Sequence, residues 1–173
     1  MAHAFWQRLR RILRHLWMDD ADLARALPPD LLDRIARRVA EGEHRHTGEV
    51  RIHAEAGLPL SYLWRDAPAR ERAITLFGKL RVWDTEHNNG VLIYLLLAEH
   101  AIEIVADRGV ARHVPPQAWQ ALVAHLGRAF REGRYEAGLL HAVDDVSALL
   151  AQHFPRRHED TAPNELPDRP TLG

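Results

Sequence analysis

Side chains that carry oxygen cluster in two short segments of this sequence. Asp84, Glu86, Asn88 and Asn89 lie within one polar stretch, and Asp107 stands in a later polar corner of the chain. Carboxylate and amide oxygens are the ligands that hard divalent cations such as calcium and magnesium prefer. These five residues therefore form a candidate site for Ca²⁺ or Mg²⁺, provided that the fold brings the two segments together.

The residues between these segments predict a β-hairpin. Residues 91–98 are wholly apolar and residues 102–106 nearly so, as expected of buried strands, and a short polar connection joins them. Because the two strands of a hairpin are antiparallel, the loop that enters the first strand lies beside the corner that leaves the second. Residues 84–90 and 107–109 are thus expected at one edge of a sheet, where they can share a polar site.

The same polar residues also have a purely structural explanation. Asp84 and the run Asn88-Asn89-Gly90 are typical of a turn, because Asn and Asp side chains hydrogen-bond nearby backbone and glycine tolerates positive φ. Arg108 has two uses as well, since its guanidinium can clamp Asp84 or bind a phosphate group. Both alternatives stay open at the level of the sequence.

Basic side chains flank the candidate site in the chain. Arg112 precedes a helix that begins near Pro115, whose N-terminal amides favour an anion, so Arg108 and Arg112 form a candidate anion site. His44 and His46 precede the first expected strand and would face the same way on an extended segment, which would favour a transition metal. Because the chain has twelve histidines, ordinary surface positions are the competing explanation for both.

Several short motifs follow one another along the middle of the chain. They are Thr47-Gly48-Glu49, Phe77-Gly78-Lys79-Leu80, the run from Arg81 to Gly90, Asp107-Arg108-Gly109 and Tyr135-Glu136-Ala137-Gly138-Leu139. In this combination, which spans roughly residues 34–154, the chain resembles the TPM domain family. Some members of that family are described as weak acid phosphatases, some bind divalent cations, and others look like accessory modules for membrane complexes. The resemblance therefore implies a fold but specifies no activity.

The expected elements predict an α/β fold. A strand at 49–56, a helix at 67–80 and the strand at 91–98 form a right-handed parallel crossover, after which the strand at 102–106 returns antiparallel. Polar residues alternate along the strand at 49–56, which places it nearer the sheet edge. With further helices flanking the sheet, we expect a three-layer α/β/α sandwich around a small mixed sheet of three or four strands. The family resemblance implies the same fold.

We divide the chain into three parts. Residues 1–29 hold an N-terminal amphipathic helix and a linker, and residues 30–154 form one TPM-like domain. The tail at 155–173 has four prolines and few apolar residues, so we expect it to be disordered.

Composition excludes several classes of function. The chain has 173 residues, 23 Lys and Arg against 24 Asp and Glu, and a formal net charge of -1, so no nucleic-acid partner is expected. The absence of cysteine excludes a thiol nucleophile, disulfides and thiolate metal sites. The longest apolar run is shorter than a membrane span, and the N-terminus lacks the apolar core of a secretory signal. We therefore expect a cytoplasmic protein.

The N-terminal helix, expected at residues 5–18, is strongly amphipathic and basic. One explanation is that its apolar stripe packs on the domain. The other is contact with a partner groove or with an anionic membrane, which would make the protein peripheral to the inner face of the membrane. The apolar stripe consists of Phe5, Trp6, Leu9, Ile12, Leu13, Leu16 and Trp17.

Two functions follow as hypotheses. We favour a binding or assembly accessory module that engages an unidentified protein partner, because the sequence holds no complete catalytic set. The alternative is a weak metal-dependent acid phosphatase, a phosphomonoesterase in which Asp84, Glu86 and Asp107 hold a cation that polarises a phosphoryl oxygen. No general base stands out for that reaction, so its catalytic residues are unknown. Calcium or magnesium is the only cofactor that either hypothesis implies.

Overall fold

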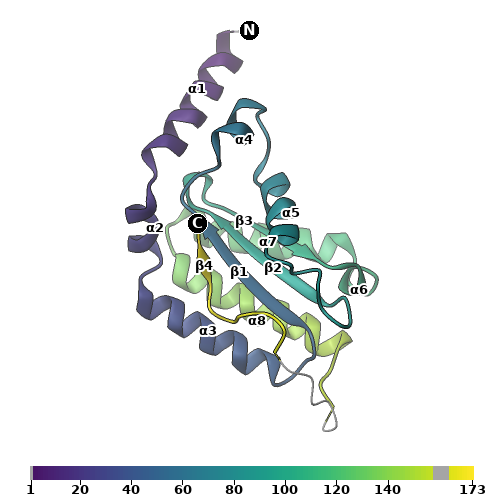
Figure 1. Cartoon of the computed structure of the whole chain (residues 1–173). Helices are drawn as coiled ribbons and strands as arrows, with labels where there is room; N and C mark the ends of the chain where they lie inside the picture. The colour runs from purple at the N-terminus through teal and green to yellow at the C-terminus, as the bar shows by residue number, and fades with distance from the viewer. Residues whose placement is uncertain (1, 158–163) are drawn as a thin grey trace.

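A four-stranded mixed sheet forms the centre of the protein. The computed structural model describes residues 2–157 and 164–173. Its strands are β1 (Glu49–Glu55), β2 (Gly90–Leu96), β3 (Ala101–Ala106) and β4 (Thr171–Leu172), in the spatial order β3-β2-β1-β4 (Figure 1). β1 pairs parallel with β2 and with β4, and β2 pairs antiparallel with β3. The predicted parallel crossover and hairpin are both confirmed.

Helices cover both faces of this sheet and complete the three-layer α/β/α sandwich. The helices are α1 (Ala2–Trp17), α2 (Asp20–Ala26), α3 (Pro29–Glu43), α4 (Leu60–Trp64), α5 (Ala69–Lys79), α6 (Arg108–Ala111), α7 (Pro116–Arg131) and α8 (Tyr135–His153), with a 3-10 turn η1 (Leu97–Glu99) inside the hairpin. The face formed by the apolar side chains of β1 packs against α2, α3, α7 and α8. The opposite face packs against α4, α5 and Leu166 of the C-terminal segment.

The two inner strands differ in composition, although both are buried along their whole length. β2 is apolar on both faces, as its unbroken run of hydrophobic residues predicts. β1 alternates, with Val50, Ile52 and Ala54 in the larger core and charged or polar residues on the other face. The expectation that β1 lies nearer the sheet edge is wrong, because β4 pairs with its outer side.

The C-terminal tail also differs from the expectation of disorder over 155–173. Residues 164–173 run along β1, add the short strand β4 to the sheet and bury Leu166 in the smaller core (Figure 1). The reason is that partners for this segment come from polar side chains of β1, which composition alone does not reveal. Residues 158–163 lie outside the described part of the chain.

The N-terminal helix α1 extends away from the sandwich, with the N-terminus far from the sheet (Figure 1). Asp19 ends the break after α1 and caps α2, because its carboxylate accepts from the Asp22 amide while the Asp22 side chain accepts from the Asp19 amide. None of the helices in the described part of the chain combines the length and the hydropathy that crossing a bilayer requires.

Candidate functional site

The loops that precede β2 and follow β3 meet at one end of the sheet, as the hairpin predicts. The amide of Asp107 donates to the carbonyl of Gly90 at 2.9 Å, and the amide of Gly109 donates to the carbonyl of Asn88 at 3.0 Å. Arg108 Nε donates to Asn88 Oδ1 at 3.0 Å. Gly109 is required here, because a Cβ at this position would lie 2.3 Å from the Asn88 carbonyl oxygen. Arg108 therefore fastens the two loops together through Asn88.

Two oxygens at this end of the sheet are buried without a hydrogen-bond partner in the described part of the chain. They are Oδ1 of Asn89 and Oδ2 of Asp107. The amide nitrogen of the Asn89 side chain donates to the Thr47 carbonyl at 2.8 Å, and Asp107 Oδ1 accepts from the Arg108 amide at 2.6 Å. A buried oxygen without a partner carries a desolvation cost, and a bound cation or water is the usual remedy.

The other candidate ligands have different surroundings. Asp84 is exposed and pairs with Arg81, not with Arg108 as the clamp hypothesis required. Glu86 is exposed, and its backbone amide donates to the Glu165 carboxylate at 3.1 Å. Over residues 2–157 and 164–173, no three side chains of His, Asp or Glu come close enough to hold a metal ion together. Any cation at these loops would thus need backbone or amide oxygens among its ligands.

The predicted anion site keeps only part of its expected arrangement. Arg108 is exposed, and its Nε donates to Asn88, as described above. Arg112 caps the C-terminal end of α6 and is also exposed. Arg108 is therefore the first residue of the four-residue helix α6, and Arg112 directly follows its last residue.

The two histidines before β1 face different surroundings, contrary to the expectation that they point the same way. His44 is exposed in a helical turn at the end of α3, whereas His46 is fully buried. His46 Nδ1 lies 2.9 Å from the Gly48 carbonyl, which makes this nitrogen the donor, and burial lowers the pKa of His46 to about 4. The imidazole is therefore neutral near pH 7 and belongs to the domain interior.

Two buried carboxylates, Glu43 and Glu49, lie at the end of α3 and the start of β1, and sequence reasoning missed them. Burial, with a further contribution from the nearby Glu49 carboxylate, raises the pKa of Glu43 to about 8. Glu43 Oε1 accepts from the Val50 amide at 3.2 Å, and Glu49 Oε2 accepts from the Leu166 amide at 3.1 Å. Glu49 belongs to the Thr-Gly-Glu motif, which was the one signal in the sequence that pointed to this cluster.

The helix α1 forms a second candidate site, built on a small polar anchor. Arg11 donates to Glu99 at 2.7 Å, to Asp66 at 2.8 Å and to the Ala67 carbonyl at 2.6 Å. The buried ring of His15 accepts from the Leu58 amide at 3.0 Å through Nδ1 and lies 3.0 Å from Glu99 through Nε2. These contacts fix one side of α1 to the loops on both sides of α4 and to the turn before β3.

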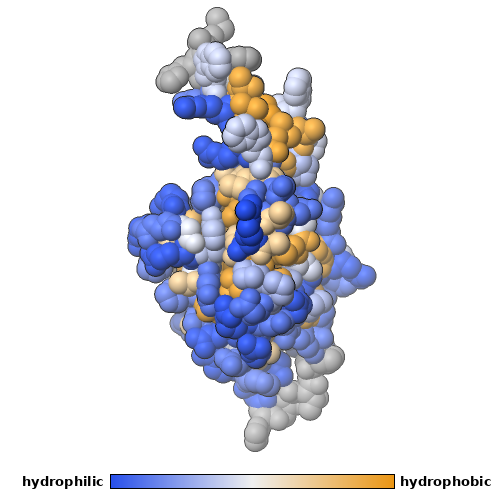
Figure 2. Space-filling model, turned by 90° about the vertical axis from the view of Figure 1, so that its left-hand side faces the viewer, coloured by the Kyte–Doolittle hydropathy of each residue, from blue (hydrophilic) through white to orange (hydrophobic). Residues whose placement is uncertain are grey.

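The opposite side of α1 remains on the surface. The exposed fractions are 59% for Trp6, 44% for Leu13, 58% for Leu16 and 83% for Trp17. Figure 2 shows hydrophobic groups, in orange, along the projecting part at the top of the molecule. The hypothesis that the apolar stripe packs on the domain is thus met only in part, by Ile12, which contacts the smaller core.

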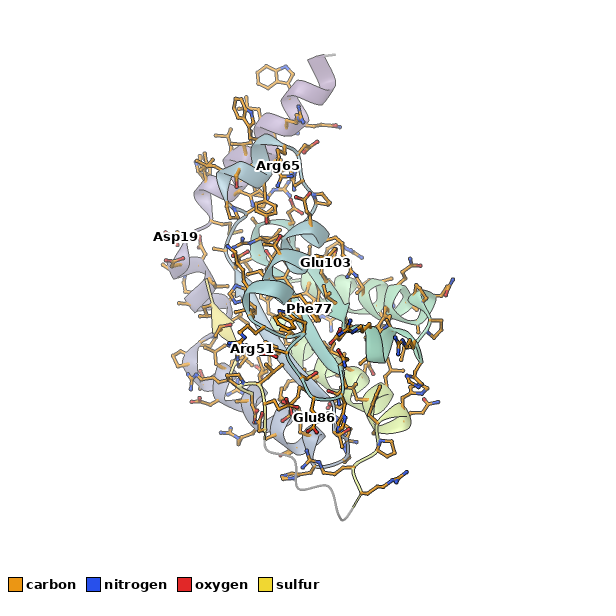
Figure 3. The ribbon with its side chains drawn as sticks, turned by 45° about the vertical axis from the view of Figure 1, so that its right-hand side comes forward. Asp19, Arg51, Arg65, Phe77, Glu86 and Glu103 are labelled. Atoms are coloured by element: carbon orange, nitrogen blue, oxygen red, sulfur yellow. The ribbon has the colours of Figure 1, made fainter. Side chains whose placement is uncertain are left out.

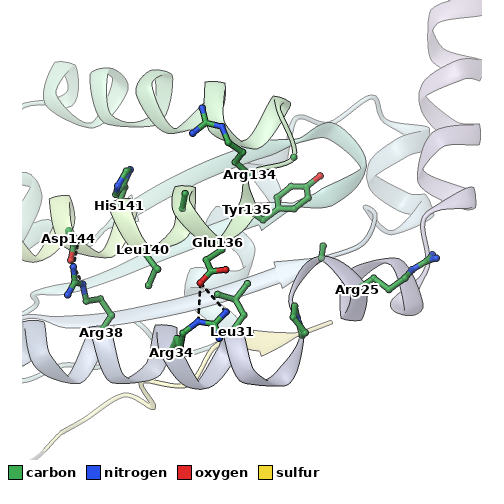
Figure 4. Close-up of a pocket in the computed structure, with 14 residues that line it drawn as sticks. Arg25, Leu31, Arg34, Arg38, Arg134, Tyr135, Glu136, Leu140, His141 and Asp144 are labelled. Atoms are coloured by element: carbon green, nitrogen blue, oxygen red, sulfur yellow. Dashed lines mark hydrogen bonds and ion pairs between the residues drawn. The ribbon is translucent and has the colours of Figure 1, made fainter.

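A surface hollow of about 970 Å³ lies between α3 and α8 and is rich in arginine. Figure 4 shows that Arg34 reaches Glu136 and that Arg38 reaches Asp144 across this hollow. The shortest contacts are 3.0 Å for the first pair and 2.7 Å for the second. Both arginines thus have carboxylate partners, and their role is explained by ion pairs that join the packed helices α3 and α8.

Comparison with known proteins agrees with this fold. A family model described as TPM domain matches residues 21–149. Among solved structures, the BA42 protein from the psychrophilic bacterium Bizionia argentinensis has 25% sequence identity and a TM-score of 0.73, covering 85% of this chain and 95% of that chain. The N-terminal domain of a P. gingivalis protein has 19% identity and a TM-score of 0.58, covering 76% of this chain and 83% of that chain. No curated protein matches the chain.

The matched region contains β1, β2 and β3, both candidate loops and α3 to α7, with nearly all of α8. It leaves α1 and the C-terminal segment, with β4, outside the match. The family model covers well over half of the 173 residues. The chain therefore belongs to the TPM domain family.

Proposed function

We propose that this protein is an accessory binding module that attaches to an anionic membrane surface through α1 and presents its TPM domain to a protein partner there. The observation that carries this proposal is the exposed apolar stripe of α1, which includes two tryptophans. Burying such a stripe in a bilayer interface is favourable in proportion to its apolar area, and tryptophan prefers the headgroup region.

The charge of α1 supports an anionic surface as the partner. Residues 2–17 include four arginines and no acidic residue. Two of these arginines pair with the domain, Arg8 with Asp66 and Arg11 with both Asp66 and Glu99. Arg10 and Arg14 remain exposed and, with Leu13 and Trp17, line one shallow hollow. Basic side chains that border an apolar stripe can contact lipid headgroups while the stripe enters the interface.

The anchor at His15 and Arg11 adds an orientation to this contact. Because these side chains hold α1 to the domain, a membrane-bound helix would carry the sandwich in a defined orientation. Sedimentation with vesicles of phosphatidylcholine, with and without phosphatidylglycerol, measures the affinity. We expect binding to the anionic vesicles and weaker binding at high salt, since exposed charges are screened.

Matched variants test whether vesicle binding depends on the apolar stripe of α1 or on exposed apolar residues in general. Replacing Leu13 and Trp17 by serine should reduce the affinity about tenfold or more, because two exposed apolar contacts are lost. Replacing Arg10 and Arg14 by glutamine should remove the preference for anionic vesicles. Trp64→Ser is the control, since Trp64 is 84% exposed on α4, outside the stripe. Equal losses in the control and the stripe variant would refute the proposal.

A divalent cation at the loop cluster is the second function that a specific observation favours. Asn89 Oδ1 and Asp107 Oδ2 are buried oxygens without a partner in the described residues, and both are ligand types for calcium or magnesium. Titration of Ca²⁺ and then Mg²⁺ into isotope-labelled protein should give saturable amide shifts confined to 84–90 and 107–109. Asp107→Asn should weaken the affinity about tenfold, whereas Asp84→Asn, at an exposed residue paired with Arg81, should have less effect. Spectra that stay flat would remove the cation from the proposed function.

A further inference from the structure

Four ionisable side chains lie in a row on one face of β1 and are almost completely buried. The exposed fractions are 3% for Glu49, 6% for Arg51, 6% for His53 and 4% for Glu55. They alternate with the apolar residues that face the larger core, so they share the opposite face of the strand. Burying charged groups is unfavourable unless partners compensate the lost hydration. The identity of these partners therefore indicates what the row is built to bind.

Most of the partners come from the C-terminal segment, residues 164–173. The Arg51 guanidinium donates to the carbonyl of Pro167 at 2.6 Å and to the carbonyl of Arg169 at 3.0 Å, and it lies 3.3 Å from Thr171 Oγ1. Glu49 accepts from the Leu166 amide. Figure 3 shows Arg51 close to the yellow C-terminal segment. Arg51 and Glu49 thus contact mainly backbone groups, which any extended peptide would present.

The far end of the segment pairs with the sheet itself. Thr171 pairs with His53 and Leu172 with Ala54 in parallel register, and the Gly173 amide donates to the Ala54 carbonyl at 3.0 Å. His53 Nδ1 lies 2.9 Å from Thr171 Oγ1. Leu166 provides the apolar anchor, since its side chain is buried in the smaller core. Main-chain pairing with one side-chain anchor is the usual mode by which a sheet edge binds an extended peptide.

Glu55 behaves differently from the other three residues, because its partners belong to the domain. Burial opposes its ionisation, but hydrogen bonds from Arg72, His53 and Tyr94 outweigh this effect and hold the pKa of Glu55 at about 2. By contrast, burial raises the pKa of Glu49 and lowers the pKa of Arg51. Glu49 and Arg51 thus depend on the C-terminal segment for the hydrogen bonds that compensate their lost hydration.

We propose that the edge of β1 is a binding site for an extended peptide, and that the C-terminal segments of two copies of this chain exchange there. Without the segment, the sheet order leaves β1 as an open edge strand, which readily pairs with another chain. A segment from a second copy can make every contact that the chain's own segment makes, so exchange requires no new interface. Exchange at β1 needs no contribution from α1 and stands apart from the proposed membrane contact.

Cross-linking tests this exchange in the full-length protein. Asp33 of α3 and Arg169 of the C-terminal segment form an exposed ion pair, and the chain has no cysteine. Asp33→Cys and Arg169→Cys variants are mixed at high concentration, incubated and treated with a short bismaleimide. We expect roughly tenfold more covalent dimer in the mixture than with either variant alone, because only exchange brings the two cysteines of different chains together.

Two controls make a negative result decisive. The variant with both substitutions should cross-link within one chain, which proves that the reagent spans the two positions and that the segment keeps its place. A synthetic peptide of residues 164–173 should suppress the dimer, whereas a scrambled peptide should not. Monomer alone in the mixture, with efficient cross-linking in the double variant, would overturn the exchange. Equal suppression by both peptides would overturn the site at β1.

Discussion

The two segments outside the family domain, α1 and residues 164–173, show opposite relations between composition and packing. α1 is rich in large apolar residues, yet it leaves Trp6, Leu13, Leu16 and Trp17 exposed. The C-terminal segment is polar and contains two prolines, yet it runs along β1 and buries Leu166. Apolar content therefore does not decide which terminal segment packs on this domain.

In both segments, complementary polar partners decide which residues pack on the domain. Arg11 and His15 attach α1 through hydrogen bonds, and Arg51 with Glu49 attaches the C-terminal segment in the same way. Because an unpaired buried donor or acceptor costs free energy, each buried group on the domain selects a segment that can satisfy it. The difference is that α1 leaves several large apolar side chains exposed, whereas the C-terminal segment buries Leu166.

The largest effect on stability is expected from Arg51→Ala, which removes the main hydrogen-bond donor to the C-terminal segment. The substitution leaves the carbonyls of Pro167 and Arg169 without their donor and opens a cavity, so the free energy of unfolding should fall by about 3 kcal/mol. Urea unfolding followed by circular dichroism measures the loss. Arg169→Ala is the control, and breaking its exposed pair with Asp33 should cost less than about 1 kcal/mol. Equal losses would contradict the central role of Arg51.

A second prediction concerns how the free energy of unfolding changes with pH, through the buried carboxyl group of Glu43. Glu43, whose pKa is raised to about 8 by burial, by Glu49 and by Asp168, stays protonated in the folded protein but ionises above about pH 4.5 when unfolded. Its contribution to stability is therefore complete below pH 4.5 and is lost as pH rises toward 8. Glu43→Gln should match the native chain at pH 4 and exceed its stability by about 3 kcal/mol at pH 9.

Thermal unfolding across this pH range checks the Glu43 prediction. Glu41→Gln serves as the control, because Glu41 lies on the same helix with its side chain 66% exposed. A difference between Glu43→Gln and the native chain that does not change with pH would show that Glu43 is ionised in the folded state.

A smaller and local effect is expected from His15→Ala in the anchor of α1. The change removes the acceptor of the Leu58 amide and one contact of Glu99, so the local stability of α1 should fall by about 1–2 kcal/mol. Hydrogen exchange of the α1 amides measures this loss directly. Leu16→Ala should leave exchange of the same amides nearly unchanged, since Leu16 is exposed. A similar acceleration in both variants would mean that the polar anchor does not hold the helix.

The smallest effect is expected from Trp17→Ser on α1. Trp17 is 83% exposed, so its loss should change the free energy of unfolding by less than about 0.5 kcal/mol. Chemical denaturation measures this change in the absence of lipid. A large loss would place Trp17 in the packing of the domain and would weaken the contrast between the two terminal segments.

The central fold was predictable because its signals are periodic and local. Continuous apolar runs marked β2 and β3, and their short connection implied an antiparallel hairpin, which placed Asn89 and Asp107 at one end of the sheet. The outward positions of Asp84 and Glu86 were not predictable. Loop residues carry no periodicity, so the direction of a side chain depends on which neighbour, for Asp84 the guanidinium of Arg81, is available in the folded chain.

The buried histidine and carboxylates escaped prediction for a related reason. His46 differs from His44 only in its position relative to the turn after α3, and Glu43 and Glu49 have the composition of surface residues. Burial of a polar side chain depends on the elements that cover it, including α8 and the C-terminal segment. These elements are distant in sequence, so no local pattern reports them.

The sequence by itself determined β1 to β3, the hairpin, the crossover and the TPM domain, because apolar periodicity and turn chemistry act between near neighbours. Only the tertiary structure decided the fate of the two terminal segments. The place of residues 164–173 depends on Arg51 and Glu49, and that of α1 depends on Glu99 and Leu58. Hydrogen bonds between residues so far apart in the chain form only when folding has brought their partners into reach.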